Sequence, residues 1–157
     1  DTLGHRAGDR VLQGAAAVLS AGVRRSDRVF RYGGEEFAIL MPETGELAAA
    51  AALDRVRRAL AEQAISYGRG EAQVRCSIGV TTYQSGESEE EFVVRADRAC
   101  YAAKRRGRDQ VVLERVVDGA SRELCLAEID PRARNAAEAV GEALGADAPA
   151  TAAGGAG

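Results

Sequence analysis

Two adjacent carboxylates, Glu35 and Glu36, directly follow the glycine pair Gly33-Gly34, which separates two short apolar runs. Such a pair is typical of a two-residue β-hairpin turn, because the turns that suit a hairpin need positive φ at their centre. Neighbouring strand residues point to opposite faces, so we expect the two glutamates to lie in different environments. A carboxylate on a hairpin suits Mg²⁺, which takes one or two carboxylates together with phosphates. The alternative is a solvated turn with two exposed acids.

Three helices are predicted around this hairpin. Apolar residues at helical spacing indicate one helix around 11–19 and another over 46–60, with Thr44 as the expected cap of the second. A capping box of Ser88 and Glu91 indicates where the third helix begins. Each of these helices needs a sheet or another helix on which to bury its apolar face.

Two further strands are predicted after the hairpin. Residues 74–80 alternate strictly between apolar and polar, the pattern of a strand with one buried face, and residues 110–113 indicate a short final strand. The chain order is therefore helix, hairpin, helix, strand, helix, strand. This order predicts the α/β class, as an α+β sandwich with helices packed on a mostly antiparallel sheet.

Composition excludes several classes of protein. The chain has 157 residues, of which 46% are apolar, which is enough for one compact domain. The net charge of −3 argues against a nucleic-acid binder, which would carry a strongly basic face. The sequence contains no run of about 18 apolar residues, the length that a membrane-spanning helix would need. Three cysteines without a C-x-x-C pair favour a reducing cytoplasm, and the single histidine argues against a zinc site.

The folded unit is expected to end near Leu113, and we assign residues 1–117 to it. Residues 118–157 form a C-terminal tail that becomes rich in alanine and glycine, and we expect this tail to be largely disordered. The first residue is Asp1 rather than Met, so we expect the chain to be part of a longer gene product.

Four segments in order resemble the GGDEF family, the bacterial diguanylate cyclases, in the variant spelled G-G-E-E-F. The resemblance covers nearly all of residues 1–113, and four weak motifs with fitting gaps are together specific. It implies the ferredoxin-like palm of nucleotidyl cyclases. The segments are Asp1-x-x-Gly4-His5-x-x-Gly8-Asp9, the hairpin Arg31 to Phe37, Ser77-Ile78-Gly79-Val80, and Ala96-Asp97-x-Ala99-x-Tyr101-x-Ala103-Lys104-x-x-Gly107-Arg108.

The activity that the resemblance implies is condensation of two GTP molecules to cyclic di-GMP with release of pyrophosphate. In this family two domains, each holding one GTP, meet as a homodimer through the active-site face. Glu35 is similar to the family's ligand for Mg²⁺ or Mn²⁺, and Glu36 to the second acid, which assists activation of the 3′-hydroxyl. Gly33 and Gly34 would let the backbone approach the triphosphate without a side chain between them.

The remaining substrate contacts are implied in the same way. Asp9 matches the carboxylate that accepts hydrogen bonds from guanine, and Leu12 is similarly placed to pack on the base. Lys104 and Arg108, which we expect on one helix face, match a phosphate-binding basic pair. The alternatives are an acid near a helix end for Asp9 and, for the pair, a basic last turn stabilised by the helix dipole.

A second site is implied upstream of the hairpin. Arg24 and Asp27 form an R-x-x-D at the offset of the family's product-inhibition site for cyclic di-GMP, and Arg55 is a candidate auxiliary arginine. Arginine can bind phosphate or the guanine Hoogsteen edge, and a carboxylate can accept from the Watson–Crick edge. The alternative is a polar turn before a strand.

The resemblance also implies parts that this chain does not contain. The family's opening strand, with another metal-binding Asp and a phosphate-binding loop, would precede Asp1, as would an Asn that helps to read guanine. We therefore expect the fragment itself to be impaired and the longer protein, with an upstream sensor domain, to be the active cyclase. A membrane-bound parent remains open. The alternatives to a cyclase are a non-catalytic cyclic di-GMP receptor and a GTP-sensing or dimerisation module.

Overall fold

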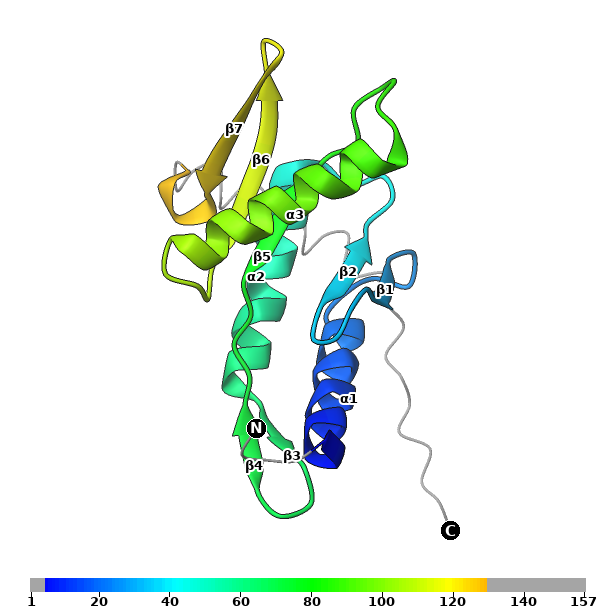
Figure 1. Cartoon of the computed structure of the whole chain (residues 1–157), viewed down its shortest axis with the longest axis vertical. Coiled ribbons are helices and arrows are strands. Elements are labelled where there is room, and N and C mark those ends of the chain that lie inside the picture. Colours follow the sequence, from blue (N-terminus) through cyan, green and yellow to red (C-terminus); the bar gives the residue numbers. More distant parts are fainter. Residues whose placement is uncertain (1–4, 130–157) are drawn as a thin grey trace.

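The computed structural model describes residues 5–129. Within this range helices and strands alternate along the chain (Figure 1). The elements are α1 (His5–Ala21), β1 (Arg28–Arg31), β2 (Phe37–Leu40), α2 (Glu46–Glu62), β3 (Ala64–Ser66), β4 (Glu71–Gln73), β5 (Ile78–Thr81), α3 (Glu89–Arg105), β6 (Val111–Val117), β7 (Ala120–Cys125) and the 3-10 helix η1 (Leu126–Glu128).

The strands form small sheets instead of one continuous sheet. β1 pairs with β2 and β3 with β4, both antiparallel, while β5, β6 and β7 form a third sheet. In that sheet β5 runs parallel to β6, and β6 runs antiparallel to β7. The predicted α/β class with mostly antiparallel pairing is confirmed. No helix among residues 5–129 combines the length and the apolar character that crossing a bilayer requires.

The first four residues of β6, the middle strand of the third sheet, are buried. Val111 and Leu113 of β6 pack against α2 in the main core, while Val112 between them packs against α3. Because side chains alternate across a strand, the two helices must cover opposite faces of the sheet, as Figure 1 shows. β6 is consequently the centre of the fold. The C-terminal half of α3 packs against it through Ala99, Ala102 and Ala103.

The contact between β5 and α3 depends on one glycine. A Cβ added to Gly79 would overlap the backbone N of Cys100 and the carbonyl O of Ala96. Only glycine therefore lets the helix backbone lie directly on the strand. This close approach sets the distance between α3 and the sheet.

A smaller core joins α1 to the end of α2. Ala15 and Val18 of α1 pack with Leu60 and Ile65. A Cβ on Gly14 would overlap the Ile65 side chain, so the helix is also close to β3. This second core fixes α1, which carries the N-terminal candidate residues.

The helix predictions agree with the structure except in one cap. The capping box of Ser88 and Glu91 is present at the start of α3. At α2 the cap position is Gly45, which makes no side-chain hydrogen bond, and Thr44 Oγ1 instead donates to the carbonyl O of Pro42 at 2.9 Å. Thr44 is therefore a turn residue and not the cap.

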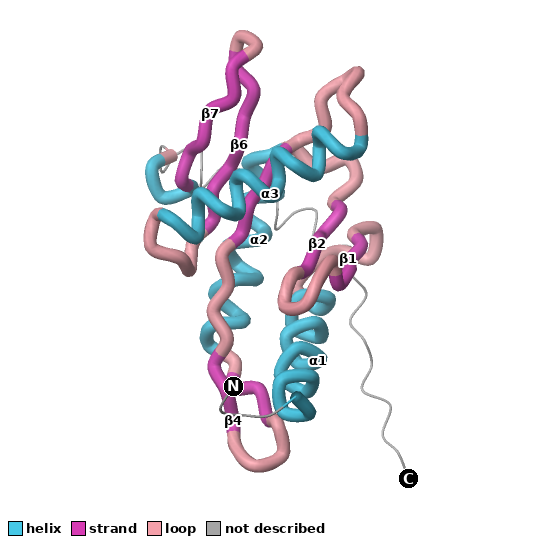
Figure 2. Tube along the Cα trace, viewed as in Figure 1, coloured by secondary structure: helices cyan, strands magenta, loops and turns pink. Residues whose placement is uncertain are grey.

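Only the last part of the stretch predicted as a strand over 74–80 is a strand. β4 ends at Gln73 and β5 begins at Ile78, and Figure 2 shows the stretch between them as a loop. The alternation itself is correct, since Val74 and Cys76 still pack against the smaller core. What the pattern could not show is that this stretch pairs with no strand in the described part of the chain.

The folded unit extends beyond its predicted end at Leu113. β6 continues to Val117, the turn residues Asp118 and Gly119 have φ of 51° and 75°, and β7 follows. Two positive-φ residues are what a two-residue hairpin turn requires, and Asp-Gly is a preferred pair for it. The predicted tail therefore does not hold for residues 118–129, whereas residues 130–157 lie outside the described range.

Candidate active site

The hairpin that carries the two glutamates turns one residue later than predicted. Arg31 pairs with Phe37, and beyond them the N–H of Tyr32 donates to the carbonyl O of Glu36 at 2.8 Å. Gly33 and Gly34 do not have positive φ. Gly33 and Glu36 exchange both backbone hydrogen bonds, each at 3.3 Å, so the two connecting residues are Gly34 and Glu35. A two-residue connection is therefore confirmed, but the primed turn expected at Gly33-Gly34 is wrong.

The Arg31 side chain stabilises this connection by hydrogen bonds to its backbone. Its Nε and Nη2 atoms donate to the carbonyl O of Gly34 at 3.1 and 2.7 Å. This fork holds the backbone of the tip in one arrangement, although no residue in the tip is buried. Sequence reasoning did not find this role of Arg31, and the signal available was an arginine at the last position of β1.

The hairpin tip and the end of α3 meet through one ion pair. Lys104 Nζ lies 3.3 Å from Glu36 Oε1, and the two side chains are about half exposed. The hydrogen bond that Lys104 donates to the Glu36 carboxylate raises the pKa of Lys104 above its usual value. Glu35 is exposed beside this pair in sequence. The structure thus brings a predicted acid and a predicted phosphate ligand together in solvent.

The backbone around the tip is open on one side. A Cβ on Gly34 would have no atom within 4 Å, and one on Gly33 would meet only Glu36 Oε2, at 3.4 Å. The space beside the Gly34 backbone is therefore free for another molecule.

Arg108 does not lie on the helix face with Lys104. α3 ends at Arg105, and Gly107 and Arg108 have φ of 113° and 63°. The N–H of Arg108 donates to the carbonyl O of Ala103 at 3.0 Å, which closes the helix end. Arg108 is exposed in this turn, so its spacing from Lys104 does not follow helical periodicity.

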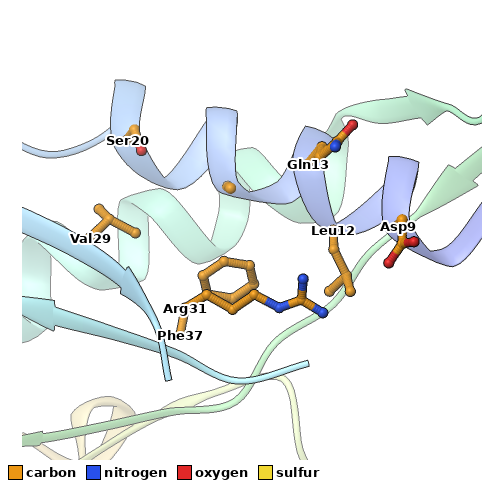
Figure 3. A pocket seen from close by; sticks show the side chains of 8 residues that line it. Asp9, Leu12, Gln13, Ser20, Val29, Arg31 and Phe37 are labelled. Atoms are coloured by element: carbon orange, nitrogen blue, oxygen red, sulfur yellow. The ribbon is translucent and has the colours of Figure 1, made fainter. Parts of the chain in front are cut away.

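A cavity of about 390 Å³ lies between α1 and the hairpin. Its walls include Asp9 and Leu12 from α1 and Arg31 and Phe37 from the two strands (Figure 3). In this view Leu12 points toward the Arg31 guanidinium group, and Asp9 lies one turn along the helix. The structure thus places Asp9 and Leu12 on the same cavity as the hairpin. The other lining residues are Gln13, Ala16, Ser20 and Val29.

Arg24 and Asp27 form a closed turn before β1. Asp27 is 6% exposed, its Oδ2 atom accepts from the Arg24 N–H at 2.9 Å, and its own N–H donates to the carbonyl O of Arg24 at 3.0 Å. Asp27 Oδ1 and Arg55 Nη1 are buried without a hydrogen-bond partner in the described structure. The Asp27 carboxylate therefore holds the turn and keeps one unused acceptor atom.

The carboxylates suit a hard divalent cation only as part of a ligand set. Residues 5–129 contain no group of three or more His, Cys, Asp and Glu side chains placed to hold a metal ion. Glu35 and Glu36 are exposed oxygen ligands at a free backbone edge. Mg²⁺ keeps several waters and uses one or two carboxylates plus substrate phosphates, so these two residues fit that partial role.

Comparisons with known proteins give one consistent result. The family model described as diguanylate cyclase, GGDEF domain, matches residues 1–110. Diguanylate cyclase A of Treponema denticola is 40% identical over 116 residues, which are 73% of this chain and 31% of that protein. The chain thus spans less than a third of the length of this curated relative.

Solved structures of similar fold include complexes. Diguanylate cyclase SiaD of Pseudomonas aeruginosa, in complex with its activator SiaC, has a TM-score of 0.68 and 42% identity, over 72% of this chain and 44% of that chain. The GGDEF domain of DgcB from Caulobacter crescentus, in complex with c-di-GMP, has a TM-score of 0.67 and 32% identity, over 72% of this chain and 68% of that chain.

Proposed function

The chain belongs to the GGDEF family of diguanylate cyclases, and from this premise we propose that it is the cyclase domain of a protein that condenses two GTP molecules to cyclic di-GMP and pyrophosphate. The observation that carries the proposal is the contact of Glu36 with Lys104 beside the open backbone of Gly34. This contact joins a carboxylate and a cation beside open backbone at one exposed edge. Those are the groups that a triphosphate and its metal ion need.

Each side chain then has a separate task at the triphosphate. Glu35 would hold Mg²⁺ or Mn²⁺, which when bound neutralises charge on the phosphates. Lys104 adds a positive charge from the end of α3, where its hydrogen bond to Glu36 raises its pKa. Glu36 lies within reach of Lys104 and accepts a proton from the attacking 3′-hydroxyl. The Gly34 backbone approaches the phosphates because no side chain stands in the way.

Selection of GTP over ATP is assigned to the cavity between α1 and the hairpin. The Asp9 carboxylate accepts hydrogen bonds from guanine N1–H and the exocyclic amine, whereas adenine presents an acceptor at N1. Leu12 gives an apolar surface on the same wall for the base. One domain holds one GTP, so turnover requires two domains that face each other as a homodimer.

Product inhibition is assigned to Arg24 and Asp27, with Arg55 as an auxiliary arginine. The unused Oδ1 atom of Asp27 and the unused Nη1 atom of Arg55 support this proposal, because buried polar atoms without partners are rare. Since β1 is extended over Arg28–Arg31, the turn and the hairpin tip are separated by roughly 13 Å, at about 3.3 Å per residue. Inhibition by cyclic di-GMP should therefore be noncompetitive with GTP.

The proposed function is tested by replacing the two acids in the full protein that contains this domain. Glu35→Ala and Glu36→Ala should each lower cyclic di-GMP formation by about a hundredfold or more, because each removes a group that acts in the transition state. Product is measured by chromatography after incubation with GTP and Mg²⁺. The matched control is Glu90→Ala, an exposed glutamate in the first turn of α3, which should retain full activity.

Two results would contradict the proposal. Wild-type protein that binds cyclic di-GMP but makes none from GTP would be a receptor and not a cyclase. Undiminished product formation by both variants would show that the hairpin acids take no part in the reaction.

A further inference from the structure

The turn after α3 has an unusual backbone. Gly107, Arg108 and Asp109 have φ of 113°, 63° and 46°, so three consecutive residues lie in the left-handed region. Only the first is a glycine, and side-chain-bearing residues adopt this conformation when their surroundings hold them in it. The position of Arg108 is therefore set by whatever holds the turn, because the helix has already ended.

The side chain of Asp109 makes the long-range contacts of this turn. Its Oδ1 atom lies 2.6 Å from Arg57 Nη1 on α2, and its Oδ2 atom lies 2.6 Å from Arg75 Nη1 in the loop before β5. The N–H of Asp109 donates to Ser77 Oγ at 3.2 Å in the same loop. One residue thus ties the turn to two segments that lie far away in the sequence.

The carboxylate is well suited to this task. Partial burial disfavours its charge, but hydrogen bonds from Arg75 and Arg57 outweigh that effect and hold the pKa of Asp109 below its usual value. Arg57 is itself oriented by Asp54, whose Oδ1 atom lies 2.8 Å from Arg57 Nε. The arginine is therefore fixed on α2 before it meets Asp109.

We propose that Asp109 is a positioning residue for substrate binding, which holds Arg108 in the left-handed turn so that its guanidinium group can contact a GTP phosphate. The inference rests on the proposed function, together with the phosphate-binding role that the family resemblance implies for Arg108. Arg108 is anchored on one side by its N–H bond to Ala103 and on the other by the contacts of Asp109. Without the second anchor the turn can relax to a right-handed conformation, and the Arg108 side chain then leaves the end of α3.

The experiment measures GTP affinity and turnover in the full protein. Arg108→Ala should raise the KM for GTP, and the dissociation constant for 3′-deoxy-GTP by calorimetry, by about tenfold, the size expected for one charge-assisted contact. Asp109→Ala should raise both constants by a similar factor. In the Arg108→Ala background, Asp109→Ala should add nothing. A residue that only stabilised the fold would not show this loss of effect.

Conservative variants separate positioning from folding. Asp109→Asn should restore part of the affinity, because its amide oxygen still accepts from one arginine. Arg75→Gln, at an exposed side chain, removes one of the two contacts without disturbing the core and should give an intermediate KM. Glu62→Gln is the matched control, since it changes an exposed carboxylate at the end of α2 that is not part of this set of contacts. It should leave the KM unchanged. All assays are run below the unfolding temperature measured for each variant.

The outcomes distinguish this inference from the proposed function. If Arg108→Ala weakens 3′-deoxy-GTP binding while folded Asp109→Ala, Asp109→Asn and Arg75→Gln do not, the positioning role is overturned and the proposed function stands. If Asp109→Ala weakens binding equally in the wild-type and Arg108→Ala backgrounds, the role of Asp109 does not pass through Arg108. Absence of any GTP binding by the wild type would overturn both.

Discussion

Glu114 is a charged side chain inside the main sheet, with only 1% of its surface exposed. Arg98 of α3 binds both of its carboxylate oxygens, and Ser121 Oγ on β7 donates to Oε1 at 2.8 Å. These contacts raise the pKa of Arg98, led by its hydrogen bond to Glu114. A buried carboxylate is tolerated only while such partners remain.

Arg98→Ala is therefore expected to lower the free energy of unfolding by about 3–5 kcal/mol, because it leaves Glu114 buried without its counter-charge. Chemical denaturation followed by circular dichroism measures the change. Arg122→Ala, at an exposed arginine on β7, is the control and should change stability by less than about 0.5 kcal/mol. Adding Glu114→Gln to Arg98→Ala should recover part of the loss, and failure to recover any would contradict this account.

Arg24 and Asp27 should differ as variants, although they belong to the same turn. Arg24→Ala removes a ligand for phosphate or guanine and should relieve inhibition by cyclic di-GMP while stability is retained. Asp27→Ala should relieve inhibition and also lower the free energy of unfolding by about 1 kcal/mol, because its carboxylate binds the Arg24 N–H. Titration of cyclic di-GMP by calorimetry and by initial rate tests both. Wild-type binding and inhibition in both variants would reduce this segment to a polar turn.

At the scale of elements, two glycines of the site region have opposite surroundings. Gly79 lies where α3 touches β5, and a Cβ there would overlap backbone atoms of α3, whereas a Cβ on Gly34 would meet nothing within 4 Å. Packing therefore requires the first glycine, and the folded protein alone does not require the second.

Gly79→Ala should lower the free energy of unfolding by about 1–3 kcal/mol, because a methyl group would force α3 away from the strand. Gly34→Ala should leave stability unchanged but reduce cyclic di-GMP formation, since its methyl group would occupy the space proposed for phosphate. Thermal unfolding and the GTP assay are measured on both variants. Gly79→Ala should change stability, and Gly34→Ala should change activity. A Gly79→Ala protein of unchanged stability would show that α3 can shift without a loss of free energy of unfolding. A fully active Gly34→Ala protein would contradict the proposal that a phosphate binds beside Gly34.

Local signals predicted elements well. The capping box of Ser88 and Glu91 acts within one turn of helix, so it could be found from the sequence and is present in the structure. The turn at Asp118-Gly119 was equally local, but the acidic, alanine-rich composition that follows led to a prediction of disorder. Composition describes the average of a segment, whereas two residues are sufficient to make a hairpin.

Contacts between distant segments were beyond sequence reasoning. Motif order brought Glu36 and Lys104 to one site, and the structure places them 3.3 Å apart. Nothing in the sequence indicated that Asp109 would pair with Arg57, which lies 52 residues away. Helical spacing even misplaced Arg108, because the end of α3 depends on Gly107 and on contacts made outside the helix.

On the scale of the whole molecule, the hairpin of β1 and β2 has fewer strand partners and more exposed apolar side chains than β6. β1 and β2 pair only with each other within residues 5–129, and Phe30 and Leu40 on one of their faces are about half exposed. The buried part of β6 instead lies between two helices. Within residues 5–129 the proposed catalytic acids are thus carried by a two-stranded hairpin, which reaches the main core through Ile39.

This difference in support has a thermodynamic consequence. A two-stranded hairpin on its own is marginally stable, so the amide hydrogens of β1 and β2 should exchange with solvent faster than those of β6. A ligand at the tip must then order the hairpin, and part of its binding free energy is used for that ordering. The Arg24–Asp27 turn leads directly into β1, so a ligand there alters the same local equilibrium. Two ligands can in this way influence each other's affinity through the order of one hairpin, without any change in the average shape of the domain.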